Sequence, residues 1–358
     1  MIKHKYLPII YIIFSFLIFN GCGSDDTVNN PGSSNPSDLT RTGKFISFTS
    51  NFNVNFDIYL AQVNSAANLE TVNLVFSSNP YNLTAGNSSD DKQSNWSPDG
   101  RMLVFSRTNG NSQEIYAFFF KADGSIDSSV TPIPQKLFSS GGNWDNNPSF
   151  SPDGKYLIWD RREDNNSPSG IDTADSRDIY TGNVTGSGSS FSIGNIHAWK
   201  TTTGSDEYNP KWAPRISVRR VVYEYATSAT SNDHDVYIMD PLDSGFNVNY
   251  YNPGRSGYPA WEPSCGKLIF ESDQGNAGLY KVVSASYPTA GTPFDLVQSN
   301  IEENRYPTWL PNGGLISFIR ITGGNGNIWI VSSGGGTPAK LLQSVPQFDA
   351  VNNLWPAW

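Results

Sequence analysis

The chain contains few of the residues that most often carry catalysis or bind metals. Its 358 residues include two cysteines, Cys22 and Cys265, and three histidines, His4, His197 and His234. No two histidines stand at a spacing typical of metal ligands, and no Gly-x-Ser-x-Gly segment marks a serine nucleophile. The sequence therefore predicts no catalytic residue, no metal site and no cofactor.

Positive charge is also scarce. Lys and Arg number 24 against 33 Asp and Glu, which gives a formal net charge of −9. This balance argues against nucleic acid or anionic lipid headgroups as partners. Paired carboxylates could serve a glycosidase, but a sequence does not place two of them at the separation that such chemistry requires.

A helical pattern is missing as well, because no stretch after the N-terminal segment combines a helical apolar period with caps. Instead, a short segment recurs, reading Trp-Ser-Pro-Asp-Gly at 96–100 and Phe-Ser-Pro-Asp-Gly at 150–154. The anchor aromatic residues of this segment and its weaker copies are Trp96, Phe150, Trp212, Trp261, Trp309 and Trp358. A period of about 50 residues indicates a solenoid, a propeller or an array.

Each repeat has the pattern of four strands. Ser-Pro-Asp-Gly favours a reverse turn, and a short apolar run such as 156–159 follows it. An Asp/Glu-Ile-Tyr segment such as 178–180 opens a third strand, and an apolar stretch such as 340–342 closes the unit. Four antiparallel strands in about fifty residues make one propeller blade. Cys265 is assigned to the Asp position of the turn at 262–266, as a tolerated substitution.

The two ends of the repeat region complement each other. Residues 352–358 begin a unit that nothing continues, and residues 43–48 continue a unit that nothing begins. We expect the C-terminal strand to pair with the strand near Phe45, which closes a ring and protects strand edges. The prediction is an all-β fold, a six-bladed β-propeller of four-stranded antiparallel blades over 43–358. Deleting the last ten residues should destabilise it.

The repeat resembles that of the TolB-like propeller family, which is built from WD40-like PD40 repeats. The resemblance rests on Pro-x-Trp-Ser-Pro-Asp-Gly-Lys/Arg followed by an apolar strand and Asp/Glu-Ile-Tyr, and it covers 43–358. The first copy departs from it, with Ser94 in place of Pro. TolB itself carries a separate N-terminal α/β domain that has no counterpart here. The resemblance therefore implies the propeller and does not imply the Tol-complex role.

The N-terminus is typical of a bacterial lipoprotein. Residues 1–21 combine Lys3 and Lys5 with a short apolar core, as signal peptides do, and Cys22 follows directly. This Cys resembles that of a lipobox and is the predicted lipidation site, which would leave no intramolecular disulfide. The alternative is an uncleaved anchor with an incidental Cys. Gly23 after the Cys favours the outer membrane by the enteric sorting rule.

Residues 22–42 are polar, without an apolar period, and are predicted to form a flexible tether. Several acyl chains on Cys22 would anchor the protein stably. We therefore expect a lipid-anchored protein of the cell envelope at the outer membrane, on its periplasmic or its surface side.

A polar segment precedes each anchor aromatic residue, and equivalent positions of propeller blades meet around the axis. These segments are predicted to ring one mouth of the central channel and to bind a basic peptide, a partner loop, a sugar or a cation. The alternative is that they satisfy the backbone where the strands converge, with water in the channel. The candidate binding residues are Asp90, Asp91, Asp145, Asn146, Asn147, Asp206, Glu207, Tyr208, Tyr258, Glu302, Glu303, Arg305, Asn352 and Asn353.

Other polar and aromatic residues receive simpler interpretations. Trp212, Trp261 and Trp309 hold one repeat position and are expected to pack between blades. His234, beside two aspartates, is interpreted as a solvated loop end. The insertion at 161–177 is long enough to carry binding function. Loop aromatics outside the pattern are candidates for sugar stacking, namely Trp144, Trp199, Tyr250 and Tyr251.

Together these features predict a membrane-tethered lipoprotein whose monomeric propeller binds an envelope protein or peptide without catalysis. An envelope carbohydrate-binding protein or hydrolase that uses the same channel is the alternative, and a surface adhesin is a third possibility. Bound Ca²⁺ or a close carboxylate pair would favour the alternative. Substituting Asp206 and Glu207 by Ala is expected to weaken a cationic partner without unfolding the ring.

Overall fold

The computed structural model describes residues 45–62, 80–122, 124–130, 132–163, 175–228, 230–275, 278–341 and 351–358. The predicted signal peptide, Cys22 and the tether lie outside these residues, as does most of the insertion at 161–177. Within the described ranges, no helix is long and apolar enough to cross a membrane.

The structure consists of antiparallel β-sheets, with two 3₁₀ turns at Gly188–Ser190 and Ile216–Val218. One sheet contains strands from both ends of the repeat region in the order β24-β1-β2-β3. Its strands are β1 (Phe45–Asn53), β2 (Asn55–Gln62), β3 (Tyr81–Asn82) and β24 (Asn353–Ala357).

The next eight strands form one sheet that has two four-stranded parts. The first part is β4 (Asp91–Trp96), β5 (Met102–Asn109), β6 (Ser112–Phe119) and β7 (Gln135–Lys136). The second part is β8 (Trp144–Phe150), β9 (Tyr156–Arg162), β10 (Arg177–Thr185) and β11 (Ser192–Lys200). A single parallel residue pair, Gln113 with Trp144, joins the two parts through β6 and β8.

Three further four-stranded sheets follow in chain order. One contains β12 (Asp206–Trp212), β13 (Val221–Ala226), β14 (His234–Asp240) and β15 (Asp243–Tyr251). The next contains β16 (Ser256–Trp261), β17 (Lys267–Ser272), β18 (Lys281–Ser286) and β19 (Phe294–Val297). The last contains β20 (Glu303–Trp309), β21 (Leu315–Thr322), β22 (Asn325–Ser332) and β23 (Ala339–Lys340).

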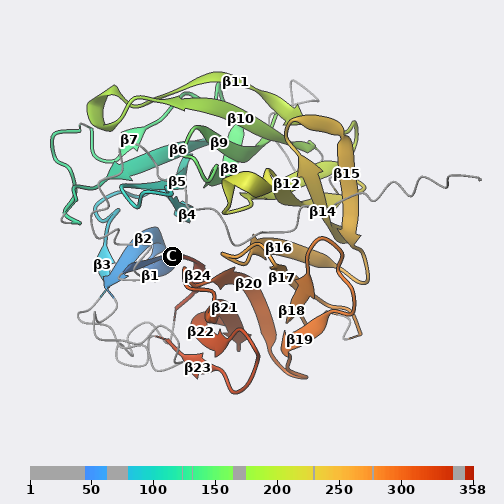
Figure 1. The fold of residues 1–358 in the computed structure, drawn as a ribbon. Helices are drawn as coiled ribbons and strands as arrows, with labels where there is room; N and C mark the ends of the chain where they lie inside the picture. Colours follow the sequence, from blue (N-terminus) through green and yellow to red (C-terminus); the bar gives the residue numbers. More distant parts are fainter. Residues whose placement is uncertain are drawn as a thin grey trace, which may run out of the picture.

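The sheets surround a common centre (Figure 1). Strands such as β4, β16, β20 and β24 lie toward that centre, and β3, β11, β15 and β23 lie toward the periphery. The position of β24 beside β1 follows from their pairing, in which Ser47 faces Ala357 and Ser50 faces Asn353. The Asn51 N–H also donates to the Asn352 carbonyl at 3.2 Å. The two ends of the repeat region are thus held in one sheet.

Each strand nearest the centre carries a β-bulge at the same repeat position. The pairing register shifts between the fourth and the first residue before the anchor aromatic residue, for example between Tyr208 and Lys211 in β12. The residue three positions before each anchor has a left-handed φ of 46–58°, which only Gly, Asn and Asp adopt readily. We call these residues the bulge ring: Gln93, Asn147, Asn209, Tyr258, Tyr306 and Trp355.

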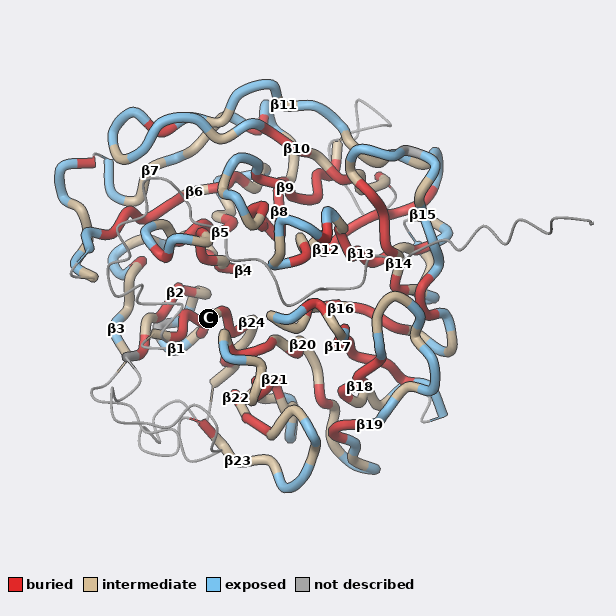
Figure 2. Tube along the Cα trace, in the orientation of Figure 1, coloured by how far each residue is buried: buried red, intermediate tan, exposed pale blue. Residues whose placement is uncertain are grey.

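The apolar cores lie between neighbouring sheets. Trp309 of β20 is 5% exposed and packs with Ile269 and Val282 of the preceding sheet, and Trp261 packs in the same way against Val222. The expectation of packing between neighbouring units is therefore confirmed for Trp261 and Trp309. Figure 2 shows buried residues along strands such as β8, β9 and β17, and exposed residues along peripheral segments such as β11. Truncating such a side chain to Ala costs about 3–5 kcal/mol.

The turns after four of the anchors share one geometry, which corrects one assignment. In the first copy, Gly100 has φ 67° and its N–H donates to the Ser97 carbonyl at 2.9 Å. Cys265 has φ 61° and makes the same bond to Glu262 at 2.8 Å. The assignment of Cys265 to the Asp position was wrong, because Cys265 takes the glycine position. Ser264 takes the Asp position and accepts the Gly266 N–H at 3.2 Å.

Candidate functional site

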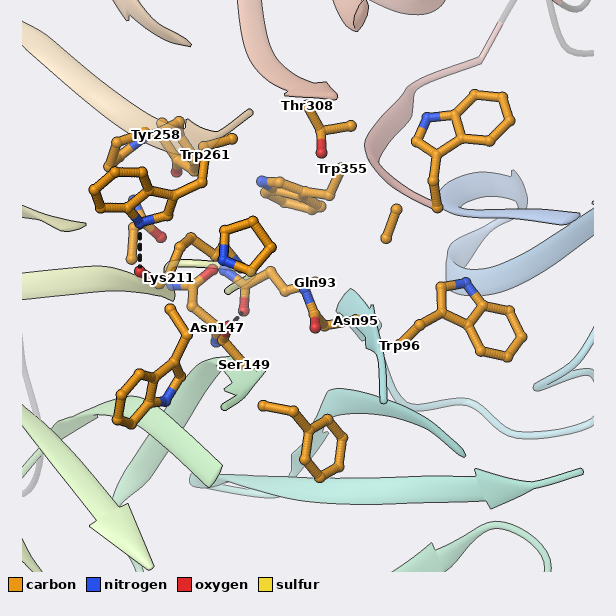
Figure 3. A pocket seen from close by; sticks show the side chains of 18 of the residues that line it. Gln93, Asn95, Trp96, Asn147, Ser149, Lys211, Tyr258, Trp261, Thr308 and Trp355 are labelled. Carbon is orange, nitrogen blue, oxygen red and sulfur yellow. Dashed lines mark hydrogen bonds between the residues drawn. The ribbon is translucent and has the colours of Figure 1, made fainter. Parts of the chain in front are cut away.

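A cavity of about 300 Å³ lies where the innermost strands converge (Figure 3). All residues of the bulge ring line it. So does a second set, the residues directly before each anchor, which we call the second ring: Asn95, Ser149, Lys211, Ala260, Thr308 and Ala357. Each repeat thus contributes two residues from equivalent positions to the cavity lining.

The lining of this cavity is rich in amides, prolines and aromatic rings. Gln93, Asn95 and Asn147 supply both hydrogen-bond donors and acceptors, and Trp261 and Trp355 supply apolar surface (Figure 3). No Asp or Glu side chain of the described ranges lines it. The cavity therefore offers polar pairing along apolar walls, as ligand sites commonly do.

Among the residues that the structure describes, Lys211 is the only charged side chain in this lining. Its amino group has no hydrogen bond or ion pair within the part of the chain that the structure describes. Burial lowers the pKa of Lys211 to about 8, against the opposing effect of the Asp160 charge. The amine is therefore mostly protonated at pH 7 and has no protein counter-ion in contact.

Buried carboxylates beneath the bulge ring tie neighbouring repeats together. In three consecutive units a carboxylate at the end of the apolar run accepts the backbone N–H of the next unit's bulge residue. The pairs are Asp160 with Asn209 (3.2 Å), Glu224 with Tyr258 (3.1 Å) and Glu271 with Tyr306 (2.9 Å). These bonds satisfy a backbone donor that the bulge removes from the strand ladder, and they fix one repeat against the next.

Of the fourteen residues predicted to bind, Asn147 and Tyr258 line the cavity. Asn146 lines a neighbouring cavity of about 170 Å³ together with Arg177. Gln93 lines both cavities, so the smaller one adjoins the bulge ring.

Several predicted carboxylates are buried in ion pairs instead. Asp91 is 0% exposed and receives two bonds from one arginine, and Asp145 receives bonds from an arginine and from the indole of Trp159. Burial raises the pKa of Asp145 to about 6, although Arg161 opposes the shift. The ion pairs are Arg107–Asp91 (2.7 Å), Arg161–Asp145 (2.7 Å) and Arg162–Asp206 (3.5 Å).

The pair chosen for substitution, Asp206 and Glu207, is also buried. Asp206 accepts the Arg177 N–H at 2.8 Å, and Glu207 is 0% exposed. Truncating either side chain therefore removes internal contacts, and it is a poor probe of a surface partner.

Tyr208 belongs to an internal chain of polar contacts. Its hydroxyl lies 2.7 Å from Nδ1 of His234, and that Nδ1 lies 2.8 Å from Glu224. Burial opposes charge on the imidazole, but the hydrogen bond and charge of Glu224 outweigh it and raise the pKa of His234. The interpretation of His234 as a solvated loop end was wrong, because its ring points inward to the Glu224 carboxylate.

The remaining candidates make local contacts away from the cavity lining. Glu302 accepts the Thr322 hydroxyl at 2.7 Å and pairs with Arg320 at 3.3 Å. Asp90 pairs with Lys92 at 2.8 Å. Glu303 forms an ion pair with Arg305 at 3.8 Å. The Asn352 N–H donates to the Asn51 side-chain oxygen at 2.8 Å, and the Asn353 side-chain amide donates to the Gly326 carbonyl at 3.4 Å.

The second ring, which includes Lys211, is not among the binding residues predicted from the sequence. The signal was available, because the position before each anchor is otherwise small or neutral and carries a cation only in this copy. Asn at the bulge position in two repeats also indicated left-handed backbone there.

Another cavity, of about 420 Å³, lies between β5–β6 and the β8–β11 part of the same sheet. Its aspartates include Asp99, whose carboxylate is occupied by Ser97 and the Arg101 N–H. No group of three or more His, Cys, Asp or Glu side chains within the described ranges could hold a metal ion. The central cavity is therefore the stronger candidate site, since it joins all repeats and holds an unpaired cation.

Sheets of antiparallel strands around an axis define the chain as a β-propeller. More particularly, it has the TolB-like propeller fold. TolB from Acinetobacter baumannii is 16% identical with a TM-score of 0.58, over 89% of this chain and 67% of that chain. A putative TolB from Agrobacterium tumefaciens is also 16% identical with a TM-score of 0.54, over 83% and 88%.

An oligogalacturonate lyase in complex with manganese is a third similar structure, 12% identical with a TM-score of 0.53, over 84% of this chain and 74% of that one. No protein-family model and no curated protein sequence matches the chain. Identities this low show a shared fold, and a fold that hosts such different proteins does not define an activity.

Proposed function

We propose that this chain is a lipid-anchored envelope protein whose six-bladed propeller binds a protein segment or peptide in its axial cavity, without catalysis. The observation that carries the proposal is the cavity itself. Equivalent positions of every repeat line it, their side chains include amides and apolar rings, and Lys211 stands in it without a partner among the described residues.

The proposed count of six blades divides the eight-stranded sheet at its single bridge between Gln113 and Trp144, and the weakness of that bridge supports the division. Each part then has four strands, like the other sheets. The recurrence of one bulge with one left-handed residue per innermost strand supports the same division. Pairing of β24 with β1 supports closure of the ring by both ends of the repeat region.

The membrane part of the proposal rests on the sequence. Residues 1–21 are the proposed signal peptide, Cys22 the lipidated residue and residues 22–42 the tether. The outer membrane is the proposed location. A lipid anchor holds the propeller near its partner and raises the effective concentration of the two.

A peptide suits the lining for a physical reason. An extended backbone presents alternating N–H and C=O groups, and the side-chain amides of Gln93, Asn95 and Asn147 can pair with both. The proline and tryptophan walls can bury apolar side chains of the same segment. The occupant is proposed to enter as a short segment, because the cavity holds about 300 Å³.

Site-specific photocrosslinking in the native envelope tests this proposal. A benzoylphenylalanine at Thr308, which lines the cavity, is compared with one at Tyr81, which is 63% exposed on peripheral β3. We expect defined peptide adducts at Thr308 and none of these adducts at Tyr81. Identical adduct patterns at both positions, or no adduct at Thr308, would count against an axial binding site.

A carbohydrate ligand or a hydrolase is the second candidate, and the tryptophans of the cavity lining favour it as stacking surfaces. The loop aromatics first considered for stacking are engaged elsewhere. Tyr250 and Tyr251 are buried, the Trp144 indole donates to Asn111, and Trp199 packs on Trp212. Glycan rather than peptide adducts at Thr308 would establish this alternative.

A further inference from the structure

We propose that Lys211 binds a carboxylate of the peptide in the axial cavity, so that this propeller recognises a peptide by a single negative charge. The inference rests on the proposed function and adds to it the chemistry of the occupant. It reverses the expectation from sequence, in which an acidic mouth receives a cation.

Lys211 is held in the cavity lining by its place on β12. It belongs to the second ring, whose members from all repeats line the cavity, and its own carbonyl accepts the Trp261 indole N–H at 3.1 Å. This bond and the pairing of Lys211 with Val222 fix the backbone from which the side chain extends. Figure 3 shows Lys211 near Asn147 and Trp261 in the lining.

Among its described residues, the cavity lining carries one positive charge and no carboxylate side chain. Lys211 is partly buried, and a cation withdrawn from water without a counter-ion is costly, so proteins generally pair such groups. Asp160 is the acidic neighbour that acts on Lys211, but its Oδ2 already accepts from Asn147 at 2.7 Å and from the Asn209 N–H at 3.2 Å. No ion pair joins Lys211 to Asp160 in the described structure. An anion bound in the cavity would form an ion pair with the Lys211 amino group.

The ligand class follows from charge and size. A single lysine matches a single carboxylate, such as the end of a peptide chain or one acidic side chain. A polyuronate carries a carboxylate on every sugar, whereas the described part of the lining holds no second cationic side chain. The net charge of −9 further disfavours polyanions. A peptide with one carboxylate is therefore the favoured occupant.

The test compares two peptides that differ only in this charge. N-acetyl-trialanine with a free carboxylate, its C-terminal amide and galacturonate are titrated into the full chain, with the tryptophan indole N–H resonances as the readout. The variants are Lys211→Met, Lys211→Arg and, as a matched surface control, Lys155→Met, whose lysine side chain is 74% exposed.

We expect the carboxylate peptide to bind the wild type and Lys155→Met equally, and Lys211→Met at least about tenfold more weakly, as for loss of a charge-assisted hydrogen bond. Lys211→Arg should retain part of the binding, and the amide peptide should not distinguish wild type from Lys211→Met. Equal binding of the carboxylate peptide to wild type and Lys211→Met, or no binding to either, would overturn the proposal. Lys211-dependent binding of galacturonate alone would overturn the peptide assignment.

This result is separable from that of the crosslinking. Peptide adducts at Thr308 that persist unchanged in Lys211→Met would leave the axial site in place and overturn the role of Lys211. Loss of those adducts in Lys211→Met, but not in Lys155→Met, would support both. The folded state of each variant is checked by its unchanged indole resonances outside the cavity.

Discussion

The Glu271 carboxylate accepts the backbone N–H of Tyr306 at 2.9 Å, joining the apolar run of one repeat to the bulge of the next. The same carboxylate receives the Arg305 guanidinium, with Nη2 at 2.6 Å. Glu271 therefore holds both the backbone and the ion pair at one boundary between repeats, and its removal leaves two donors without their acceptor.

We expect Glu271→Ala to lower the free energy of unfolding by about 3 kcal/mol, because it breaks a buried ion pair and strands a backbone N–H. Urea denaturation measures this change. Ser106→Ala is the matched control, since Ser106 occupies the same repeat position and its buried hydroxyl has no hydrogen-bond partner in the described structure. It should cost less than about 1 kcal/mol. Similar losses of unfolding free energy in both variants would contradict a stabilising role of the Glu271 contacts with Arg305 and Tyr306.

Cys265 provides a test of backbone strain. Its φ of 61° is unfavourable for a residue with a side chain, by about 1–2 kcal/mol, and three of the other turns have Gly there, namely Gly100, Gly154 and Gly313. Cys265→Gly and Cys265→Ala both remove the buried thiol, but only Gly relieves the strain. We expect Cys265→Gly to be the more stable by about 1 kcal/mol in thermal or urea unfolding. The opposite order would show that the turn is not strained at Cys265.

The strand β24 should be essential for the fold. It pairs with β1, and Ala357 and Trp358 pack into apolar cores. A truncation after Val351 exposes the β1 edge and those cores, so we expect loss of cooperative unfolding or aggregation. Trp358→Phe is the control, because it removes mainly the indole bond to Ser317 at 2.9 Å. It should cost about 1 kcal/mol, and equal stability of the truncated and full chains would contradict closure.

Glu207 should make stability depend on pH. Burial and the Asp178 charge raise its pKa from 4.5 to about 7 in the folded state. Because the folded state holds this proton more tightly, its contribution to stability is full below pH 4.5 and is lost as pH rises toward about 7. Glu207→Gln should therefore flatten the fall in the urea midpoint between pH 5 and pH 7.5, and exposed Asp233→Asn should not. Parallel profiles for wild type and Glu207→Gln would refute this.

The repeat units and their strands could be predicted because turn chemistry and apolar runs are local properties. The place of Cys265 in its turn could not be predicted. Ser264 and Cys265 both differ from the usual turn residues, and only the backbone φ shows which of them takes the glycine position. The prediction that acidic residues line the channel mouth was wrong for Asp91 and Asp145, because both carboxylates are buried. Their arginine partners lie 16 residues away on the next strand, and a segment read by itself does not show that pairing.

The axial site is tested most directly by a crystal structure of the full chain with the peptide recovered from the Thr308 crosslink. The account predicts peptide density inside the central cavity, against the bulge ring, with a carboxylate in contact with Lys211. Peptide bound only in the cavity lined by Phe119 and Phe191, or along the peripheral strands, with water alone beside Lys211, would contradict it.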